Sequence, residues 1–315
     1  MAKKKIRIVI LALSLSILIG CTNFNGQNSG DNLDNGNKVE QGQNEDTKTD
    51  DKEIIDQLKE IVKNKAKLPE AFKYLDVNIS KVTKDDSTQM VEIFEKAQKD
   101  YLATLDNKYY NEETQERFQS LNKSIEDIND LKDIEDESIK ELVTEAKSLG
   151  YKVETVEASY FPIIDYSFFK KYSNYVTDDM KEYIEIMSTE SDEAPAKDAG
   201  LVVTWDEFLN RTLTQEKFIN EYKDSAKLDD IKELYNRYVY FIFNGLANTP
   251  LFDYNTNTMV SEAKNAYLVA IESKESALLE ELRGYMNALK GTDYKLTDDI
   301  IKYGEEAIDR LSYDN

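Results

Sequence analysis

Apolar residues recur every three or four positions through most of the chain from Asp51 onward, which is the spacing of an α-helix that buries one face. Similar stripes continue to residue 149, and Gly150 then follows as a typical helix-terminating residue. We therefore predict an antiparallel helical bundle over residues 53–149. Its first stripe lies before Pro69 and consists of Ile54, Ile55, Leu58, Ile61 and Val62.

Three helices of this bundle have recognisable sequence features. Capping boxes at Asp86 and Ser138 predict the starts of two of them. Apolar steps of three, four and three residues from Phe118 to Ile128 predict a third, continuous helix. We expect the helix after Asp86 to bury Met90, Ile93, Phe94, Ala97, Tyr101 and Leu105.

The periodicity changes after residue 150. Residues 151–156 alternate between apolar and polar side chains, as a strand does, and residues 160–164 are an apolar run that contains a proline. Helical spacing then returns, and its most apolar segment covers residues 228–243. We predict an all-α fold with a minor β element near 151–164 and a C-terminal helical domain over residues 150–315.

The N-terminus is typical of a secretory signal. Four basic residues precede an uninterrupted apolar run from Ile8 to Ile19. A helix of that length spans about 18 Å, short of the roughly 30 Å hydrocarbon core of a bilayer, so we do not expect a permanent transmembrane helix. Residues 1–20 are therefore predicted to be a signal peptide.

Leu18-Ile19-Gly20-Cys21 resembles the lipobox of bacterial lipoproteins. The resemblance implies cleavage before Cys21, a diacylglyceryl thioether on its sulfur, and often a further acyl chain such as palmitate on the new amino terminus. The alternatives are an ordinary signal peptide and an uncleaved anchor. Cys21 is the only cysteine of the chain, which favours lipidation. We expect an extracytoplasmic protein that is held at the cell membrane by its lipid.

Residues 21–52 link this cysteine to the helical region. They are rich in Asn, Asp, Gln, Gly and Thr and contain almost no large apolar side chains, so we predict a disordered linker. A flexible chain of this length spans about 30 Å between its ends. The folded part is thus expected close to the membrane surface.

Composition excludes several functions. The chain carries a net charge of −22, and without the four basic residues of the leader this becomes −26, so nucleic acid is a poor partner. Histidine is absent and only one cysteine is present, which excludes His-based triads and the usual zinc sites. We expect no metal, no cofactor and no disulfide.

Candidate ligand-binding residues lie in an aromatic cluster that spans residues 160–175. Tyr160, Asp165 and Tyr166 are the residues that would line a groove for a peptide or a glycan. The alternative is that these rings pack the joint between two helical halves.

Trp205 and Glu207 form a second candidate, since a ring beside carboxylates suits sugar binding. The alternative is an ordinary helix start, where acidic residues are common. Asp165 and Glu207 would suit a glycosidase if they lay about 5 to 10 Å apart. We expect Arg211 to form an exposed ion pair on its helix.

The region from Gly150 to Leu251 resembles uncharacterised surface lipoproteins of low-GC Gram-positive bacteria, with 161–166 (FPIIDY) and 204–208 (TWDEF) as the recognisable segments. This resemblance implies no activity. The function that we expect is a non-enzymatic binding or scaffold protein of the cell envelope, with an envelope protein, a peptide or a glycan as partner. A solute-binding lipoprotein of an importer is the alternative, and a carboxylate-dependent cell-wall glycan hydrolase is a weaker one.

Overall fold

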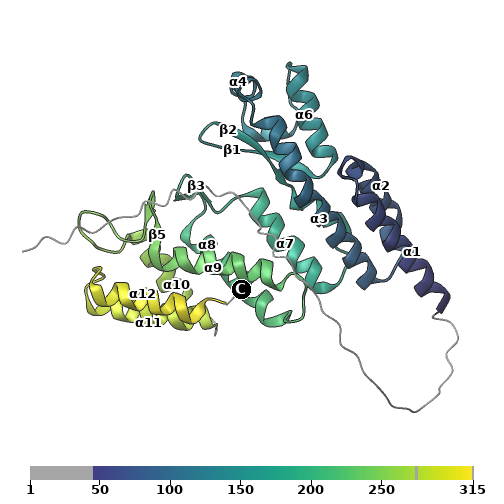
Figure 1. Cartoon of the computed structure of the whole chain (residues 1–315). Helices are drawn as coiled ribbons and strands as arrows, with labels where there is room; N and C mark the ends of the chain where they lie inside the picture. The colour runs from purple at the N-terminus through teal and green to yellow at the C-terminus, as the bar shows by residue number, and fades with distance from the viewer. Residues whose placement is uncertain (1–44, 274–275, 314–315) are drawn as a thin grey trace, which may run out of the picture.

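The computed structural model describes residues 45–273 and 276–313, and the statements below concern that part of the chain. The fold is mainly helical, as predicted, with a few short two-stranded sheets (Figure 1). The predicted signal peptide, Cys21 and most of the linker lie outside the described residues. Within them, no helix combines the length and the apolar character that crossing a bilayer requires.

The first half of the fold is built around one long helix, α3. The helices α1 and α2 pack along it, and the hairpin of β1 and β2 packs beside it as well (Figure 1). Short 3-10 helices connect α1 to α2 (η1, Lys65–Lys67) and α2 to α3 (η2, Ile79–Lys81). The α-helices of this half are α1 Glu45–Val62, α2 Leu68–Asn78, α3 Lys84–Tyr109, α4 Glu112–Ser120, α5 Ile125–Asn129 and α6 Glu137–Ser148.

Helix starts in this half differ from the sequence predictions in detail. Helix α3 begins before Asp86, because the Thr83 side chain accepts a hydrogen bond from the Asp86 amide at 3.2 Å. Helix α6 is capped by Asp136 and not by Ser138. The continuous helix predicted from Phe118 to Ile128 is wrong: α4 and α5 are separate, and Asn122 between them has a left-handed φ of 49°.

The predicted β element is a hairpin. Strands β1 (Tyr151–Val156) and β2 (Ser159–Ile164) pair antiparallel, and a turn with positive φ at Glu157 and Ala158 joins them. The hairpin begins where we predicted the domain boundary, but it packs on α3, α5 and α6 of the first half. The next segment is a 3-10 helix, η3 (Tyr166–Tyr172), which packs on α7.

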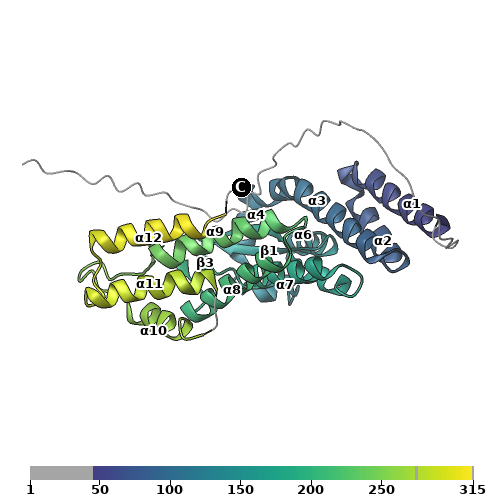
Figure 2. The ribbon, with the colours of Figure 1, turned by 90° about the horizontal axis from the view of Figure 1, so that it is seen from below.

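The second half is organised around α9, the predicted apolar helix, which lies between α8 and α12 (Figure 2). Helix α7 connects the two halves (Figure 1). Two small hairpins, β3–β4 and β5–β6, were not predicted, because two-residue strands leave no periodicity in a sequence. The elements are α7 Asp178–Asp192, β3 Ala196–Lys197, β4 Gly200–Leu201, α8 Trp205–Glu221, α9 Leu228–Asn244, β5 Gly245–Leu246, β6 Thr249–Pro250, α10 Ser261–Ala270, α11 Ala277–Gly291 and α12 Asp298–Leu311.

Nearly all buried apolar side chains of the described residues form one cluster, which runs in sequence from Ile55 to Leu311. Tyrosine contributes heavily to this core, and several of its rings are fully buried. A chain that starts after Cys21 therefore retains every residue of this core, and we expect it to fold without the leader and the lipid.

Gly245 ends helix α9 in a backbone conformation that is almost restricted to glycine, with φ 68° and ψ −168°. A Cβ atom there would also overlap the backbone nitrogen of Leu251. We therefore expect Gly245→Ala to lower the free energy of unfolding by about 3 kcal/mol in urea titrations of residues 22–315. Gly291→Ala is the matched control, because a Cβ at Gly291 meets no atom within 4 Å, and we expect it to be neutral or slightly stabilising. Equal effects of the two substitutions would contradict this explanation.

Candidate functional site

A heavily charged, buried site lies where α7 meets the first half of the fold. Its centre is Glu95 on α3, whose side chain is 3% exposed. Around it lie groups from η3, α7 and the start of α9, so the site joins both halves of the protein. Lys227, its partner from the second half, lies 132 positions after Glu95 in the sequence.

Both oxygens of the Glu95 carboxylate have hydrogen-bond or ion-pair partners. Oε1 accepts hydrogen bonds from the hydroxyls of Tyr166 at 2.6 Å and Tyr183 at 2.7 Å, and it lies 2.9 Å from Lys99 Nζ. Oε2 accepts a hydrogen bond from Lys227 Nζ. Asp230 at the start of α9 completes the network, since its Oδ2 lies 3.1 Å from the Tyr183 hydroxyl and accepts a hydrogen bond from Lys99 at 3.4 Å.

These contacts determine the ionisation of the site. Burial alone would raise the pKa of Glu95, but the charges of Lys227 and Lys99, with hydrogen bonds from Lys227 and Tyr166, lower that pKa to about 2. Burial and the nearby Glu95 charge raise the pKa values of Tyr166 and Tyr183 well above the usual range. At neutral pH the carboxylate is thus ionised and the tyrosines are neutral. With pKa values this far from neutral, the Glu95 carboxylate is a poor proton acceptor and the two tyrosines are poor proton donors. We therefore interpret the network as a structural link between the two halves.

The structure places Tyr166, a predicted ligand-binding residue, inside this network. The small crevice beside it and Tyr183 has no room for a water molecule. Tyr160 lies elsewhere, on β2, where its ring stacks on Phe118 with 4.9 Å between ring centroids. Tyr172 is also buried and donates a hydrogen bond to Asp76 at 2.6 Å. This geometry favours the packing alternative for the aromatic cluster.

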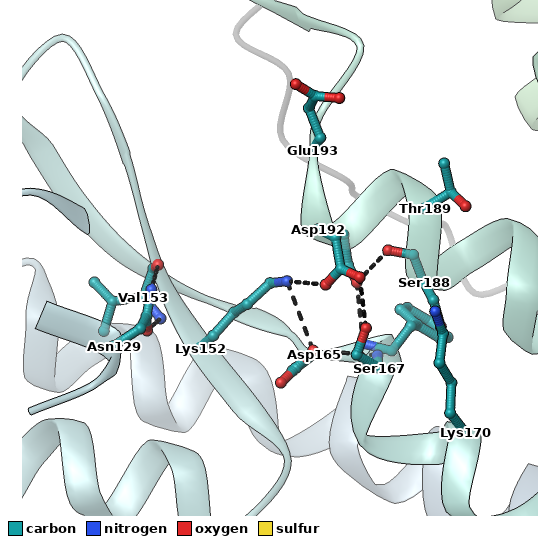
Figure 3. A network of polar contacts seen from close by, with 12 residues as sticks. Asn129, Lys152, Val153, Asp165, Ser167, Lys170, Ser188, Thr189, Asp192 and Glu193 are labelled. Carbon is teal, nitrogen blue, oxygen red and sulfur yellow. Dashed lines mark hydrogen bonds and ion pairs between the residues drawn. The ribbon is translucent and has the colours of Figure 1, made fainter. Parts of the chain in front are cut away.

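Asp165 belongs to a second, more exposed polar cluster at the C-terminal end of α7 (Figure 3). Its Oδ1 lies 3.6 Å from Lys152 Nζ and accepts a hydrogen bond from the Ser167 amide at 3.1 Å. Lys152 also donates to Asp192 at 2.8 Å, and the Ser167 hydroxyl donates to Asp192 at 2.6 Å. Burial would raise the pKa of Asp192, but the bonds from Lys152 and Ser167 lower it. Asp192 is therefore a weak base, which does not suit activation of the serine.

Glu207 lies on α8 in a third cluster, around Arg211. The Arg211 side chain is buried, contrary to the exposed pair that we predicted. Its Nε donates to Glu207 at 2.8 Å, and its other nitrogens contact Glu193, which points away from the Lys152 cluster (Figure 3). Burial raises the pKa of the adjacent Glu190, which accepts a hydrogen bond from the Tyr238 hydroxyl at 2.6 Å.

Trp205 occupies the first position of α8, behind the predicted cap at Thr204, whose side chain accepts from the Glu207 amide. Its ring is buried and packs edge-on against Tyr267, with 5.8 Å between centroids. The ring face needed for a sugar platform is thus packed inside the core. Asp165 and Glu207 are ion-paired with different cations, Lys152 and Arg211, in separate clusters.

Sequence reasoning missed Glu95, Lys99, Lys227 and Asp230. The available signal was on α3, where Glu95 and Gln98 fall on the same arc as Met90, Val91 and Phe94 and are buried with them. We assigned Ile93, Ala97 and Tyr101 to the inner face, but these residues are only partly buried. A charged residue within the apolar arc of a helix indicates a buried ion pair, although it does not identify the distant partner.

No match is found between this chain and models of known protein families, and no curated protein and no solved structure is significantly similar to it. Within residues 45–273 and 276–313, no group of three carboxylates, histidines or cysteines is arranged to hold a metal ion. The function must therefore be inferred from the chain itself.

Glu95→Gln tests the buried network. Removing the charge leaves Lys227 buried without its carboxylate partner, so we expect the free energy of unfolding at pH 7 to fall by about 3 to 5 kcal/mol. Glu92→Gln is the control, because Glu92 lies on the same helix and burial raises its pKa, so that loss of its charge should be neutral or slightly stabilising. A change below 1 kcal/mol for Glu95→Gln, on the order of one ordinary hydrogen bond, would contradict this role.

The same variants give a pH signature. Because folding lowers the pKa of Glu95 from about 4.3 to about 2, its stabilisation is present above about pH 5 and is lost as the pH falls through 2. We expect the stability difference between wild type and Glu95→Gln to shrink by about 2 kcal/mol between pH 6 and pH 2.5 in urea titrations. The raised pKa of Glu92 predicts the opposite sign for its own variant. A difference for Glu95→Gln that does not change with pH would be inconsistent with an ionised Glu95.

Proposed function

We propose that this chain is a lipoprotein of the cell envelope, which acts as a non-enzymatic binding or scaffold protein at the outer face of the cytoplasmic membrane. The observation that carries the proposal is the sole cysteine, Cys21, at the end of Leu18-Ile19-Gly20, directly after the apolar run of a signal peptide. Each buried methylene of an acyl chain contributes about 0.8 kcal/mol of membrane binding, so two or three chains make a stable anchor.

The geometry of the described residues supports a non-enzymatic role. The carboxylates of Glu95, Asp165 and Glu207 are all engaged by cations of the same chain. Tyr166 and Trp205 are buried within the fold, and the crevice beside Tyr166 has no room for a water molecule. A mainly helical body of this kind is suited to presenting its surface to a partner.

The two alternatives receive less support from this geometry. A solute-binding lipoprotein is typically built from two lobes that alternate strands and helices, whereas the described residues form only two-stranded hairpins. A glycan hydrolase would need two carboxylates facing one open site. Asp165 and Glu207 are instead fixed in separate ion-pair clusters.

Substitution of Cys21 tests the anchor. In bacteria that express the full chain and are fed radiolabelled palmitate, we expect label in the wild-type protein and complete loss of label in Cys21→Ala, because the variant has no sulfur to carry the diacylglyceryl group. Ser16→Ala, in the same leader, should keep the label. Surface proteolysis of intact protoplasts should degrade the wild-type protein. Label retained in Cys21→Ala, or a full-length protein in the cytosol, would contradict the proposal.

A further inference from the structure

A pocket of about 380 Å³ opens between the end of α1, the η1 turn and the middle of α3. This volume is within the range of small-molecule sites. The pocket is separate from the three polar clusters described above and shares no residue with them. Its lining residues are Lys59, Val62, Lys63, Asn64, Lys65, Leu68, Ile93, Lys96, Ala97 and Asp100.

The charge of this lining is opposite to that of the protein. Four lysines and a single acidic residue, Asp100, line the pocket of a chain whose net charge is −22. Lys96 pairs with Asp100 at 3.2 Å, while Lys59 and Lys63 pair with carboxylates one turn away on α1. These pairs are exposed and therefore weak, so an incoming anion can compete with them.

Lys65 is the lysine best prepared for a ligand. Its Nζ donates a hydrogen bond to the backbone oxygen of Asp100 at 2.7 Å, which fixes the ammonium group at the pocket. Among the described residues no carboxylate lies within ion-pair distance of it. The backbone oxygen of Asp100 thus holds the Lys65 ammonium group in place without cancelling its positive charge.

The floor of the pocket is apolar. Val62, Leu68, Ile93 and Ala97 contribute to it, and most of the solvent-accessible lining surface is carbon. Ile93 and Ala97 are the α3 residues that we expected in the core and that lie only partly buried. A lining that combines apolar side chains with four lysines is complementary to a molecule with an apolar chain and an anionic head.

From this complementarity we propose that the pocket binds a small anionic amphiphile, with a phosphate or carboxylate head on a short alkyl or acyl chain. The lysines bind the head and the floor binds the chain. A nucleic acid does not suit the site, because no aromatic ring lines it and the surrounding acidic surface repels a polyanion. This inference goes beyond the proposed function, and it does not depend on the lipid anchor.

Calorimetric titration of residues 22–315 with octyl phosphate, below its micelle concentration, tests the site. We expect saturable binding at one site per chain. Octyl glucoside has the same chain without charge, and inorganic phosphate has the charge without the chain; we expect each to bind at least about tenfold more weakly. Equal binding of either probe, or no binding of octyl phosphate, would overturn the proposal.

Variants locate the binding. Lys65→Gln with Lys96→Gln should weaken octyl phosphate binding by about tenfold, whereas Lys67→Gln with Lys73→Gln makes the same charge change outside the pocket and should have less than a twofold effect, as surface charges do. Ala97→Leu fills the pocket without changing charge and should also weaken binding. Ala103→Leu, at an exposed position of the same helix, is its control.

Vesicles distinguish a free amphiphile from a membrane surface. We expect octyl phosphate to bind in the absence of vesicles, and phosphatidylglycerol vesicles to show no Lys65- and Lys96-dependent sedimentation of residues 22–315. Vesicle binding without binding of octyl phosphate would mean that the lysines contact a bilayer, and would overturn the pocket as a site. Both experiments use a chain without lipid, so their failure is distinguishable from failure of the anchor.

Discussion

The buried charge of Glu95 is the constraint on which the arrangement of the two halves depends. An ionised carboxylate loses its hydration on burial and must recover that free energy from partners inside the protein. Lys99 is on the same helix, but Tyr166, Tyr183 and Lys227 come from later parts of the chain. Apolar packing is non-directional, whereas these four donors meet one carboxylate only when α3, η3, α7 and the start of α9 are docked together in one geometry.

Features that depend on neighbouring residues were largely predictable from the sequence. The three- to four-residue spacing of apolar side chains predicted the helices, and the alternation of apolar and polar residues after Gly150 predicted the β1–β2 hairpin. Errors arose where local signals compete: Thr83 and Asp136 cap their helices in place of equally suitable residues nearby. The break at Asn122 interrupts a regular apolar spacing, because α4 packs on α3 and β2 whereas α5 packs mainly on β1.

The candidate site was less predictable, because its chemistry is set by contacts between distant residues. The sequence marks Tyr166 as part of an aromatic cluster, but it does not show that the hydroxyl donates to Glu95, 71 residues earlier. Arg211 looks like a surface residue until Glu190 of α7 and Glu193, directly after that helix, are packed beside it. The buried face of α3 differs from the predicted one for the same reason. Glu95 faces the interior to reach its distant partners, so Ile93 and Ala97, on another side of the helix, line the pocket.

The distribution of basic residues then distinguishes structure from ligand binding. Lys227, Lys152 and Arg211 are largely buried, and each has a shielded carboxylate from another segment within ion-pair distance, which makes separating these partners costly. The pocket lysines pair only with exposed neighbours, and Lys65 only with a backbone oxygen. Exchanging such weak partners for a ligand anion costs little. In an acidic protein, an anion is therefore expected to bind most readily at lysines that are held in place but only weakly paired, because the fold loses little when they change partners.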